Sequence, residues 1–469
     1  MRILVTGGAG FVGSHLVDAL LARGHAVRVY DSLDRQVHPS GRLPSWVPEQ
    51  VEFIHGDVYD RPRLKSAIEG IDVIFHEAAL VGVGQSMYQI RRYVEGNSLG
   101  GATLLDILAN EKHSVKKLIV ASSMSIYGEG AYECSACGDV SPDLRGKTQM
   151  AAHDWELKCP NCGRKVGALP TPESKPLSPT SIYAVTKRDH EEMFLSFGRA
   201  YGLPTVALRY FNIYGSRQQL SNPYTGVLAI FSGRLLSNNA PVVYEDGLQT
   251  RDFVHVSDVV QANLLALDKS TGDYEAMNVG TGRAVSILEI NDRLQKNLGT
   301  TIEPDVRRQF REGDIRHCYA DISKIREKLG YSPHGRKNEK KYADRAEWEG
   351  ETLARSRRLQ GLSILERLRR VRGELPVILA TSSEELALAG SEALAADELV
   401  SLERWEEGAA SGPLPCPGGA ELLVLSGRLD EPAGPAGTWL RLPPGATLDL
   451  RAAEPTSFYW KRGHLRGPL

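Results

Sequence analysis

The sequence is poor in cysteine, in net charge and in long apolar runs, and each shortage excludes a class of protein. Six cysteines in 469 residues are better explained by metal binding or burial than by disulfides. A formal net charge of -2 gives no bulk attraction to nucleic acid or anionic membranes. No apolar run reaches membrane-spanning length, and a strand pattern begins at residue 2, which leaves no room for a signal peptide. We therefore expect a cytoplasmic protein with no nucleic-acid or membrane partner.

The length implies more than one domain. A chain of 469 residues exceeds one ordinary core, and its composition, 42% hydrophobic and 24% charged, is that of a globular protein. Motifs and composition predict a catalytic region over 1–335, with an insert over 130–176. A highly charged helical linker over 336–372 and a C-terminal domain over 373–469 follow.

The first thirty-one residues predict a dinucleotide-binding unit. Residues 2–6 and 26–31 are short apolar segments typical of buried strands. Between them, Gly7, Gly10 and Gly13 precede a helical pattern whose N-terminus can offer N–H groups to a pyrophosphate. Asp31 follows about twenty residues later, where a carboxylate binds ribose hydroxyls and favours NAD over NADP. A glycine-rich turn in an unrelated α/β protein is the alternative, which the two strands and the acid disfavour.

Strand and helix patterns alternate through the rest of this region. The pattern predicts strands over 51–54, 72–76 and 117–121 and helices over 63–68 and 97–108. This alternation is typical of the Rossmann architecture, a doubly wound parallel sheet of the α/β class. Asp57 follows the third strand, where an acid can meet an adenine amino group. Ala78 and Ala79 follow the fourth, where small residues let a cofactor lie against the backbone.

A tyrosine and a lysine lie four residues apart in the helix predicted over 179–201. Tyr183 and Lys187 therefore share one face. Such a pair is common on surface helices, but here it follows a dinucleotide fold and a serine-rich strand end that includes Ser123. Lys187 and a nicotinamide cation can both lower the pKa of Tyr183, so that its phenolate can remove the proton of a sugar hydroxyl near neutral pH. Ser123 can hydrogen-bond the same hydroxyl.

At these residues the chain resembles the extended short-chain dehydrogenase/reductases of the NAD-dependent nucleotide-sugar epimerase and dehydratase family. The resemblance covers residues 1 to about 332 and rests also on the motifs at 6–13, 76–79, 208–212, 251–256 and 278–280. It implies that Ser123, Tyr183 and Lys187 form the catalytic set. The NAD contacts that it implies are Gly7, Gly10, Phe11, Val12, Gly13, Asp31, Asp57, Val58, Ala78, Ala79, Asn97, Ser122, Tyr183, Lys187 and Tyr210.

The resemblance also implies contacts to the substrate's diphosphate by Asn212, Arg217, Arg251 and Arg311. Independently, the planar fork of an arginine suits a diphosphate, which it can bind bidentately. A single arginine is more often solvated or ion-paired. The nucleotide should be held in a small substrate lobe, for which the pattern predicts helices over 227–237, 258–267 and 286–298.

One departure from the family pattern distinguishes epimerisation from dehydration. Sugar 4,6-dehydratases of this family carry an Asp-Glu pair directly after the catalytic Ser or Thr, and these acids eliminate water across C5 and C6. Here the two positions hold Met124 and Ser125, neither of which can act as that acid or base. Epimerisation at C4 is therefore expected, by oxidation to a 4-keto sugar and return of hydride to its other face.

The insert carries two Cys-x-x-Cys pairs, Cys134 with Cys137 and Cys159 with Cys162. The 21 residues between the pairs fall within the range of a zinc-ribbon-like site with four thiolates. Such a site has no open position, so the zinc should be structural. Two disulfides or four free thiols are the alternatives. Because the insert leaves the strand that ends near Ser123 and returns before Tyr183, it could cover the sugar pocket.

The insert and the motifs at 210–215 and 249–253 are similar to those of bacterial dTDP-L-rhamnose 4-epimerases, which implies that substrate and a homodimer. In the C-terminal domain, strands are predicted over 375–380, 421–425, 439–442 and 447–450, and a helix over 383–396. Residues 418–465 resemble a cupin-like lobe, but Pro415 and Pro417 stand where cupins carry a metal-binding His pair. We therefore expect a metal-free, mostly β domain.

Three other functions are compatible with the sequence. Two are enzymatic: a UDP-glucose/galactose 4-epimerase, and a nucleotide 4-keto-sugar reductase that would consume external NAD(P)H. The third is an NAD-sensing regulatory protein, which would need none of Ser123, Tyr183 and Lys187. The intact set therefore favours an enzyme.

Overall fold

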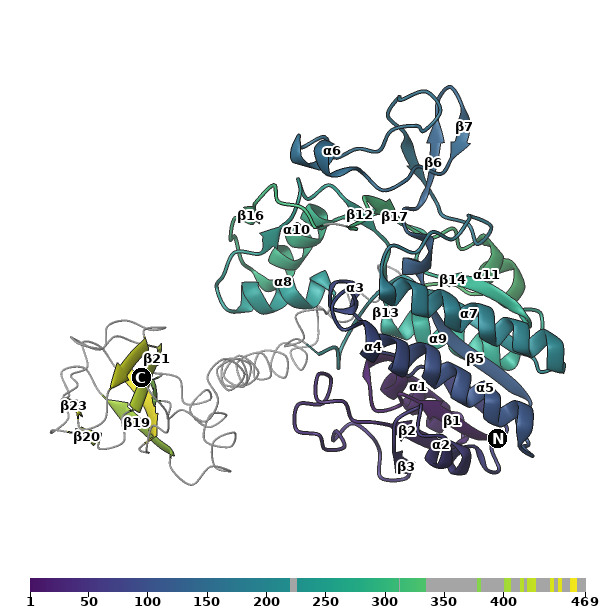
Figure 1. Ribbon diagram of the computed structural model, residues 1–469, viewed down its shortest axis with the longest axis horizontal. Coiled ribbons are helices and arrows are strands. Elements are labelled where there is room, and N and C mark those ends of the chain that lie inside the picture. Colours follow the sequence, from purple (N-terminus) through teal and green to yellow (C-terminus); the bar gives the residue numbers. More distant parts are fainter. Residues whose placement is uncertain are drawn as a thin grey trace. The chain divides into compact units, whose positions relative to one another are not determined.

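The computed structural model describes residues 1–219, 226–311 and 313–334, and the backbone of seven strands between residues 378 and 461 (Figure 1). The chain forms two compact units, Met1–Arg345 and Ala346–Leu469. Within the described residues, no helix combines the length and apolar character needed to span a bilayer. The predicted linker over 336–372 and the predicted helix over 383–396 lie outside the described residues.

A seven-stranded parallel sheet forms the centre of the first unit. Its order is β14-β9-β5-β4-β1-β2-β3. The strands are β1 (Arg2–Thr6), β2 (Ala26–Asp31), β3 (Glu52–His55), β4 (Val73–His76), β5 (Lys117–Ser123), β9 (Thr205–Tyr210) and β14 (Glu275–Val279). Strands β1 to β3 are added toward one edge of the sheet and strands from β4 onward toward the other, so the strand order reverses between β1 and β4. Ligands of such folds bind at the carboxyl ends of the strands at this point. The prediction of a Rossmann sheet is confirmed.

Helices cover both faces of this sheet (Figure 1). One face packs against α1 (Phe11–Ala22), α9 (Val256–Asp268) and α11 (Ser323–Leu329). The other packs against α2 (Arg61–Ile68), α5 (Gly100–Asn110) and α7 (Ile182–Tyr201). Alternate residues of β1 divide between the two cores, with Ile3 and Val5 on the first side and Leu4 on the second. Both sides are buried, which explains the near-continuous apolar strands.

Two helices begin later than the sequence pattern suggests. The helix that carries Tyr183 was expected from residue 179 but begins at Ile182, because the Ser181 side chain caps it by accepting a hydrogen bond from the Ala184 N–H at 3.1 Å. The helix expected over 97–108 is α5, which follows two short helices, α3 (Val83–Ser86) and α4 (Ile90–Tyr93), and a π-helical segment, η1 (Val94–Leu99).

A second group of elements lies beside the sheet, and we call these elements and the loops between them the small lobe. The elements are α8 (Val227–Leu236), α10 (Ile287–Leu298), β11 (Val242–Val243), β12 (Thr250–Arg251), β15 (Val285–Ser286), β16 (Asp305–Val306) and β17 (His317–Cys318). The core of the small lobe contains Phe231, Val243 and Ile290. Two strands, β10 (Asn212–Tyr214) and β13 (Phe253–His255), pair in parallel beside α9 and connect this lobe to the sheet.

The insert forms a small sheet of its own next to the small lobe (Figure 1). It consists of β6 (Ala131–Cys134), β7 (Gly138–Val140), α6 (Lys147–Ala151) and β8 (Gly167–Leu169), with β6 between the other two strands. Tyr132, Leu157 and Val166 form its apolar core with two of the cysteines. The Gly130 N–H bonds the His317 carbonyl at 2.8 Å, which ties the insert to β17.

The second unit contains a mixed sheet. It comprises β18 (Ile378–Ala380), β19 (Val400–Trp405), β21 (Ala420–Ser426), β22 (Trp439–Leu442) and β24 (Thr456–Lys461), while β20 (Leu414–Cys416) pairs with β23 (Ala446–Leu448). Four of these strands were predicted with bounds shifted by three residues at most; β19, β20 and β24 were not. The unit is mostly β among its described residues, and the cupin-like assignment stays a prediction.

Candidate active site

A cavity of about 570 Å³ opens at the carboxyl ends of β1, β2, β4 and β5. Sixteen of the predicted site residues line it: Gly7, Gly10, Phe11, Val12, Gly13, Asp31, Asp57, Val58, Ala78, Ala79, Ser122, Ser123, Tyr183, Lys187, Tyr210 and Asn212. The fold thus brings the glycine-rich turn and the tyrosine–lysine pair into one space, although 170 residues separate Gly13 from Tyr183 in the sequence. None of the insert residues 130–176 is among the described residues that line this cavity. Coverage of the sugar pocket by the insert stays a prediction.

The glycine-rich turn fits closely against the end of β4. Gly7 has φ +71°, a left-handed conformation that favours glycine, and a Cβ there would lie 2.8 Å from the Ala78 Cα. At Gly13 a Cβ would lie 2.2 Å from the Gly7 carbonyl oxygen. Since Phe11, Val12 and Gly13 line the cavity at the start of α1, the N-terminal end of that helix and its dipole face the ligand space.

Asp31 is fixed at the far side of the turn. Its carboxylate accepts hydrogen bonds from the Ala9 N–H at 3.0 Å and the Leu33 N–H at 2.8 Å. Burial raises its pKa, and the two backbone N–H groups and the nearby His38 oppose that effect. Each carboxylate oxygen keeps a second lone pair, so Asp31 can also accept hydrogen bonds from the two hydroxyls of a ribose.

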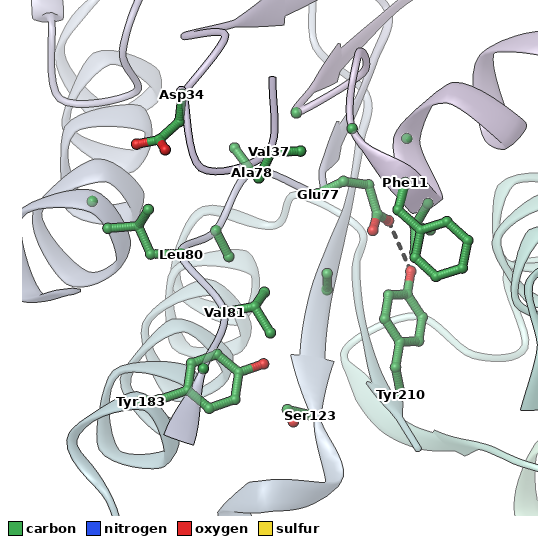
Figure 2. Close-up of a pocket in the computed structure, with 18 of the residues that line it drawn as sticks. Phe11, Asp34, Val37, Glu77, Ala78, Leu80, Val81, Ser123, Tyr183 and Tyr210 are labelled. Atoms are coloured by element: carbon green, nitrogen blue, oxygen red, sulfur yellow. Dashed lines mark hydrogen bonds between the residues drawn. The ribbon is translucent and has the colours of Figure 1, made fainter. Parts of the chain in front are cut away.

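The catalytic candidates lie on the cavity wall formed by β5 and α7. Figure 2 shows the Tyr183 hydroxyl pointing toward Ser123. Lys187, one helical turn further on, donates to the Ala121 carbonyl at 2.8 Å. Burial raises the pKa of Tyr183, and a hydrogen bond with the Ser123 side chain counteracts this rise. The Ser123 Oγ also accepts a hydrogen bond from the Ser125 hydroxyl at 2.9 Å, so Ser125 positions Ser123.

Glu77 lines the cavity, although the sequence analysis assigns it no role. The Tyr210 hydroxyl donates to its Oε1 at 2.8 Å (Figure 2), and Asn263 in turn donates to the Tyr210 oxygen at 2.7 Å. Burial raises the pKa of Glu77 to about 7, against the opposing effects of the Tyr210 hydrogen bond and Lys187. Burial lowers the pKa of Lys187 to about 8, against the opposing charge of Glu77. The sequence signals for this group were an acid directly after a buried strand and its place in the family motif at 76–79.

Two predicted cofactor residues are held by the protein itself. Asn97 does not line the cavity: its side chain bonds both backbone groups of Leu80 and the Thr186 hydroxyl. It therefore fixes Leu80, which does line the cavity. Ser122 lines the cavity, but its hydroxyl donates to Glu191 at 2.7 Å in the core.

The predicted substrate residues divide in the same way. Asn212 lines the cavity, and its buried Oδ1 has no hydrogen-bond partner among the described residues. The three arginines do not line it. Arg217 pairs with Asp18 at 2.7 Å, and Arg311 stacks on the Tyr244 ring at 4.1 Å.

Arg251 donates to three backbone carbonyls, those of residues 250, 315 and 316, at 2.7 to 2.9 Å. Its Nε–H and one N–H of Nη2 are not used in these bonds. A diphosphate contact by the arginines stays a prediction.

Comparison with known proteins identifies the family. The sequence pattern of the NAD dependent epimerase/dehydratase family matches residues 3–143 and 163–280. The chain belongs to this family. The match, together with the cavity at the end of a Rossmann sheet, makes the protein an NAD-dependent enzyme. Residues 144–162, in the middle of the insert, fall outside the match.

Relatives within the epimerase/dehydratase family include a dTDP-L-rhamnose 4-epimerase of Burkholderia thailandensis, 33% identical over 71% of this chain and 90% of the relative. A putative UDP-glucose 4-epimerase of Methanocaldococcus jannaschii is also 33% identical, over 71% of this chain and 93% of the relative. Among solved structures, the Thermotoga maritima UDP-glucose 4-epimerase with UDP-glucose has a TM-score of 0.58 and 33% identity, covering 71% of this chain and 94% of that one. The Thermus thermophilus UDP-glucose 4-epimerase complex with NAD has a TM-score of 0.56 and 32% identity, with the same coverage.

The four cysteines of the insert converge. Their sulfur atoms all lie within 4.8 Å of one another, and no disulfide joins them. Cys134 and Cys159 are buried, whereas Cys137 and Cys162 are exposed. Sulfurs at such spacing fit a tetrahedral zinc, for which Zn–S bonds of about 2.3 Å place sulfurs about 3.8 Å apart.

The Glu77 carboxyl predicts a pH dependence of stability that a single substitution removes. The pKa of Glu77 is about 7 in the folded protein, against 4.5 ordinarily, so the folded state binds more protons between these values. Its contribution to stability is therefore complete below about pH 4.5 and is lost as the pH rises through about 7. Glu77→Gln should abolish this component. Urea unfolding without NAD at about pH 5 and pH 7.5 measures it as the difference between the two proteins; equal pH slopes would contradict the prediction.

Proposed function

We propose that this enzyme is an NAD-dependent nucleotide-sugar 4-epimerase whose substrate is dTDP-L-rhamnose. The observation that carries the proposal is the single cavity that joins the glycine-rich turn to Tyr183, Lys187 and Ser123. The similarity to the Burkholderia thailandensis dTDP-L-rhamnose 4-epimerase supports the choice of substrate. The UDP-glucose 4-epimerases among its relatives support the reaction type.

The cavity residues account for each proton movement of a 4-epimerisation. With NAD bound, the positive charges of the nicotinamide and of Lys187 would oppose the rise that burial causes in the pKa of Tyr183, so that its phenolate removes the proton of the 4-hydroxyl while Ser123 holds the oxygen. Bound NAD supplies the hydride acceptor, and in its reduced form the donor, so no net oxidation results. The 4-keto sugar turns over within the site, and Tyr183 returns its proton to the 4-oxygen as hydride reaches the other face. Lys187 keeps its charge to near pH 8, the value of its pKa.

The residues after Ser123 favour this reaction over dehydration. Met124 carries a thioether, which neither donates nor accepts a proton in this pH range. The Ser125 hydroxyl bonds Ser123 at 2.9 Å. Elimination of water across C5 and C6 needs an acid and a base at this end of β5, and these two residues supply neither.

The substrate's nucleotide should be bound between the cavity and the small lobe. Asn212 can accept a hydrogen bond there, since its Oδ1 has no partner among the described residues. Arg251 and Arg311 are proposed to bind the diphosphate with N–H groups that their present contacts leave unused. Arg217 would have to exchange Asp18 for the diphosphate.

Incubation with single nucleotide sugars tests the function. The purified protein is given dTDP-L-rhamnose, UDP-glucose or UDP-galactose without added NAD, and products are resolved by chromatography and proton NMR. A 4-epimer of dTDP-L-rhamnose supports the proposal, and a 4-epimer of a UDP-hexose alone replaces the substrate. No conversion even with NAD supplied argues against epimerisation. Turnover of a 4-keto sugar with reduced cofactor would then identify a reductase, and stable NAD binding without any turnover would identify a sensor.

We further propose that the four insert cysteines hold a structural zinc ion. Thiolate ligands from two knuckles would close the coordination sphere, so the metal would supply folding energy rather than catalysis. Cys137→Ser should lower bound zinc from one equivalent per chain to near zero, measured by elemental analysis. Cys318→Ala, a buried cysteine outside the cluster, should leave the zinc content unchanged. Equal metal content in the two variants would refute the site.

A homodimer is also part of the proposal. Met87, Ile90 and Leu99 expose apolar side chains within the segment that runs from α3 to α5. Contiguous exposed apolar residues are typical of protein interfaces.

A further inference from the structure

The insert meets the small lobe through a cluster of charges in which Arg145, Glu245 and Arg316 are buried and the other members are partly exposed. We propose that the metal-loaded insert holds the nucleotide-binding lobe in its binding geometry, a role that we call the brace. Arg145 and Glu156 are the positioning residues through which the insert fixes the lobe. The proposal rests on the proposed function, because it assumes a nucleotide sugar in that lobe. We call the cluster formed by Arg145, Glu156, Glu245, Asp246 and Arg316 the clasp.

Arg145 reaches from the insert into the small lobe. Its guanidinium makes a bidentate pair with Glu245, at 2.8 and 2.9 Å, and both side chains are almost fully buried. The same guanidinium donates to the carbonyls of Trp155 in the insert, at 3.0 Å, and Asp314 in the small lobe, at 3.1 Å. One insert residue therefore fixes two separate segments of the lobe.

Glu156 makes the reciprocal contact. It accepts two hydrogen bonds from Arg316, at 3.0 and 2.6 Å, and lies 3.3 Å from His317. Arg316, whose side chain is fully buried, also donates to Glu245 at 2.9 Å and to both oxygens of Asp246 at 2.7 and 2.9 Å. The pKa of Glu156 falls to about 2, most of all because of its contact with His317.

The charges of the clasp alternate in sign along the order Arg145, Glu245, Arg316, Glu156. The outer two residues belong to the insert and the inner two to the lobe, so two opposite-charge pairs join the insert to the lobe. Removing a buried member of such a set leaves its partner uncompensated, which is far more costly than losing an exposed pair. The insert and the lobe should therefore separate or deform if Arg145 loses its charge.

The clasp is adjacent to the arginines proposed to bind the substrate. Tyr244, on which Arg311 stacks, directly precedes Glu245. The carbonyls of Ile315 and Arg316 hold the Arg251 guanidinium at 2.7 and 2.9 Å. Displacement of residues 244–246 or 314–316 would therefore move both arginines. An error of about 1 Å in such groups can cost about 100-fold in a positioned reaction.

The cysteines close the loop that carries the clasp. Arg145 and Glu156 both lie between Cys137 and Cys159 in the sequence. A metal that joins the two cysteine pairs therefore closes this segment into a loop and reduces its conformational entropy. Since no insert residue is among the described residues that line the NAD cavity, loss of the metal should leave NAD in place. The brace thus predicts weaker binding of nucleotide with unchanged binding of cofactor.

Binding measurements on the full-length protein test this split. Titration calorimetry with dTDP and with UDP should give about 10-fold to 100-fold weaker affinity for Arg145→Met than for wild type, the loss expected for one or two displaced hydrogen bonds to a charged diphosphate, while NAD content stays the same. Arg164→Met is the matched control, an exposed arginine of the same insert, and should bind as wild type does. Arg145→Lys, which keeps the charge but not the bidentate geometry, should fall between them.

A double-mutant comparison tests whether the cysteines act through the clasp. Cys137→Ser should weaken nucleotide binding in the wild-type background but add little to Arg145→Met, because both break the same brace. Hydrogen exchange should rise over residues 244–251 and 313–317 in either variant, without any need for turnover. Unchanged exchange and affinity in Arg145→Met would overturn the brace while leaving the epimerase proposal intact. A wild type that binds neither nucleotide would overturn both.

Discussion

Replacing Tyr183 with phenylalanine should lower kcat for 4-epimerisation by about 100-fold to 10,000-fold, the range that a positioned acid–base group contributes. The substitution removes one oxygen and keeps the ring, whose edge packs against Tyr93 with centroids 6.4 Å apart. NAD should remain bound, because the turn at Gly7 to Gly13 and Asp31 are unchanged. Proton NMR of the product from dTDP-L-rhamnose, with NAD measured after denaturation, separates the two effects.

Tyr93→Phe is the control for this prediction. Tyr93 is buried beside Tyr183, and its hydroxyl donates to Gln85 at 3.3 Å, away from Ser123. It therefore loses the same atom from a neighbouring ring without touching the proton transfer, and kcat should stay within about a factor of ten of wild type. If Tyr93→Phe were as slow as Tyr183→Phe, the phenol of Tyr183 would have no special part in the reaction.

The dinucleotide unit was predictable because its determinants are close in sequence. Gly7, Gly13 and Asp31 act within one β-α-β unit, where steric limits on a Cβ and the period of buried residues are visible in the letters themselves. Tyr183 and Lys187 are similar, since helical spacing alone places them on one face. The comparison with the epimerase/dehydratase family supports the same reading of residues 3–143 and 163–280.

The buried polar groups were not predictable, because their partners come from distant segments. Glu77 meets Tyr210 across 133 positions, and Arg316 meets Glu156 across 160. No periodicity encodes such pairs, and a charged residue in isolation looks like a solvated one. Arg251 shows the converse: the sequence offers a whole guanidinium for a diphosphate, whereas in the fold three backbone carbonyls already occupy part of it. Only the fold shows which groups are already satisfied.

Removing one partner of the buried pair of Glu191 and Arg209 should destabilise the protein far more than removing one partner of an exposed pair. Glu191, on α7, accepts hydrogen bonds from two guanidinium nitrogens of Arg209 on β9, at 2.5 and 2.9 Å, and from the Ser122 hydroxyl on β5. Both partners are about 5% exposed. Glu191→Ala leaves Arg209 charged and buried, and should cost about 3–5 kcal/mol.

The next residue of the same helix provides the control. Glu192 pairs with Arg188 at 2.7 Å, but the two side chains are 56% and 41% exposed. Water screens this pair and replaces it readily, so Glu192→Ala should change the unfolding free energy by no more than about 0.5 kcal/mol. Hydrogen exchange of the β5 and β9 amides in urea reports on the sheet alone, whatever the second unit does. Equal losses in the two variants would contradict the prediction: the Arg209 charge would then be compensated without Glu191, and the apolar core would hold α7 to the sheet.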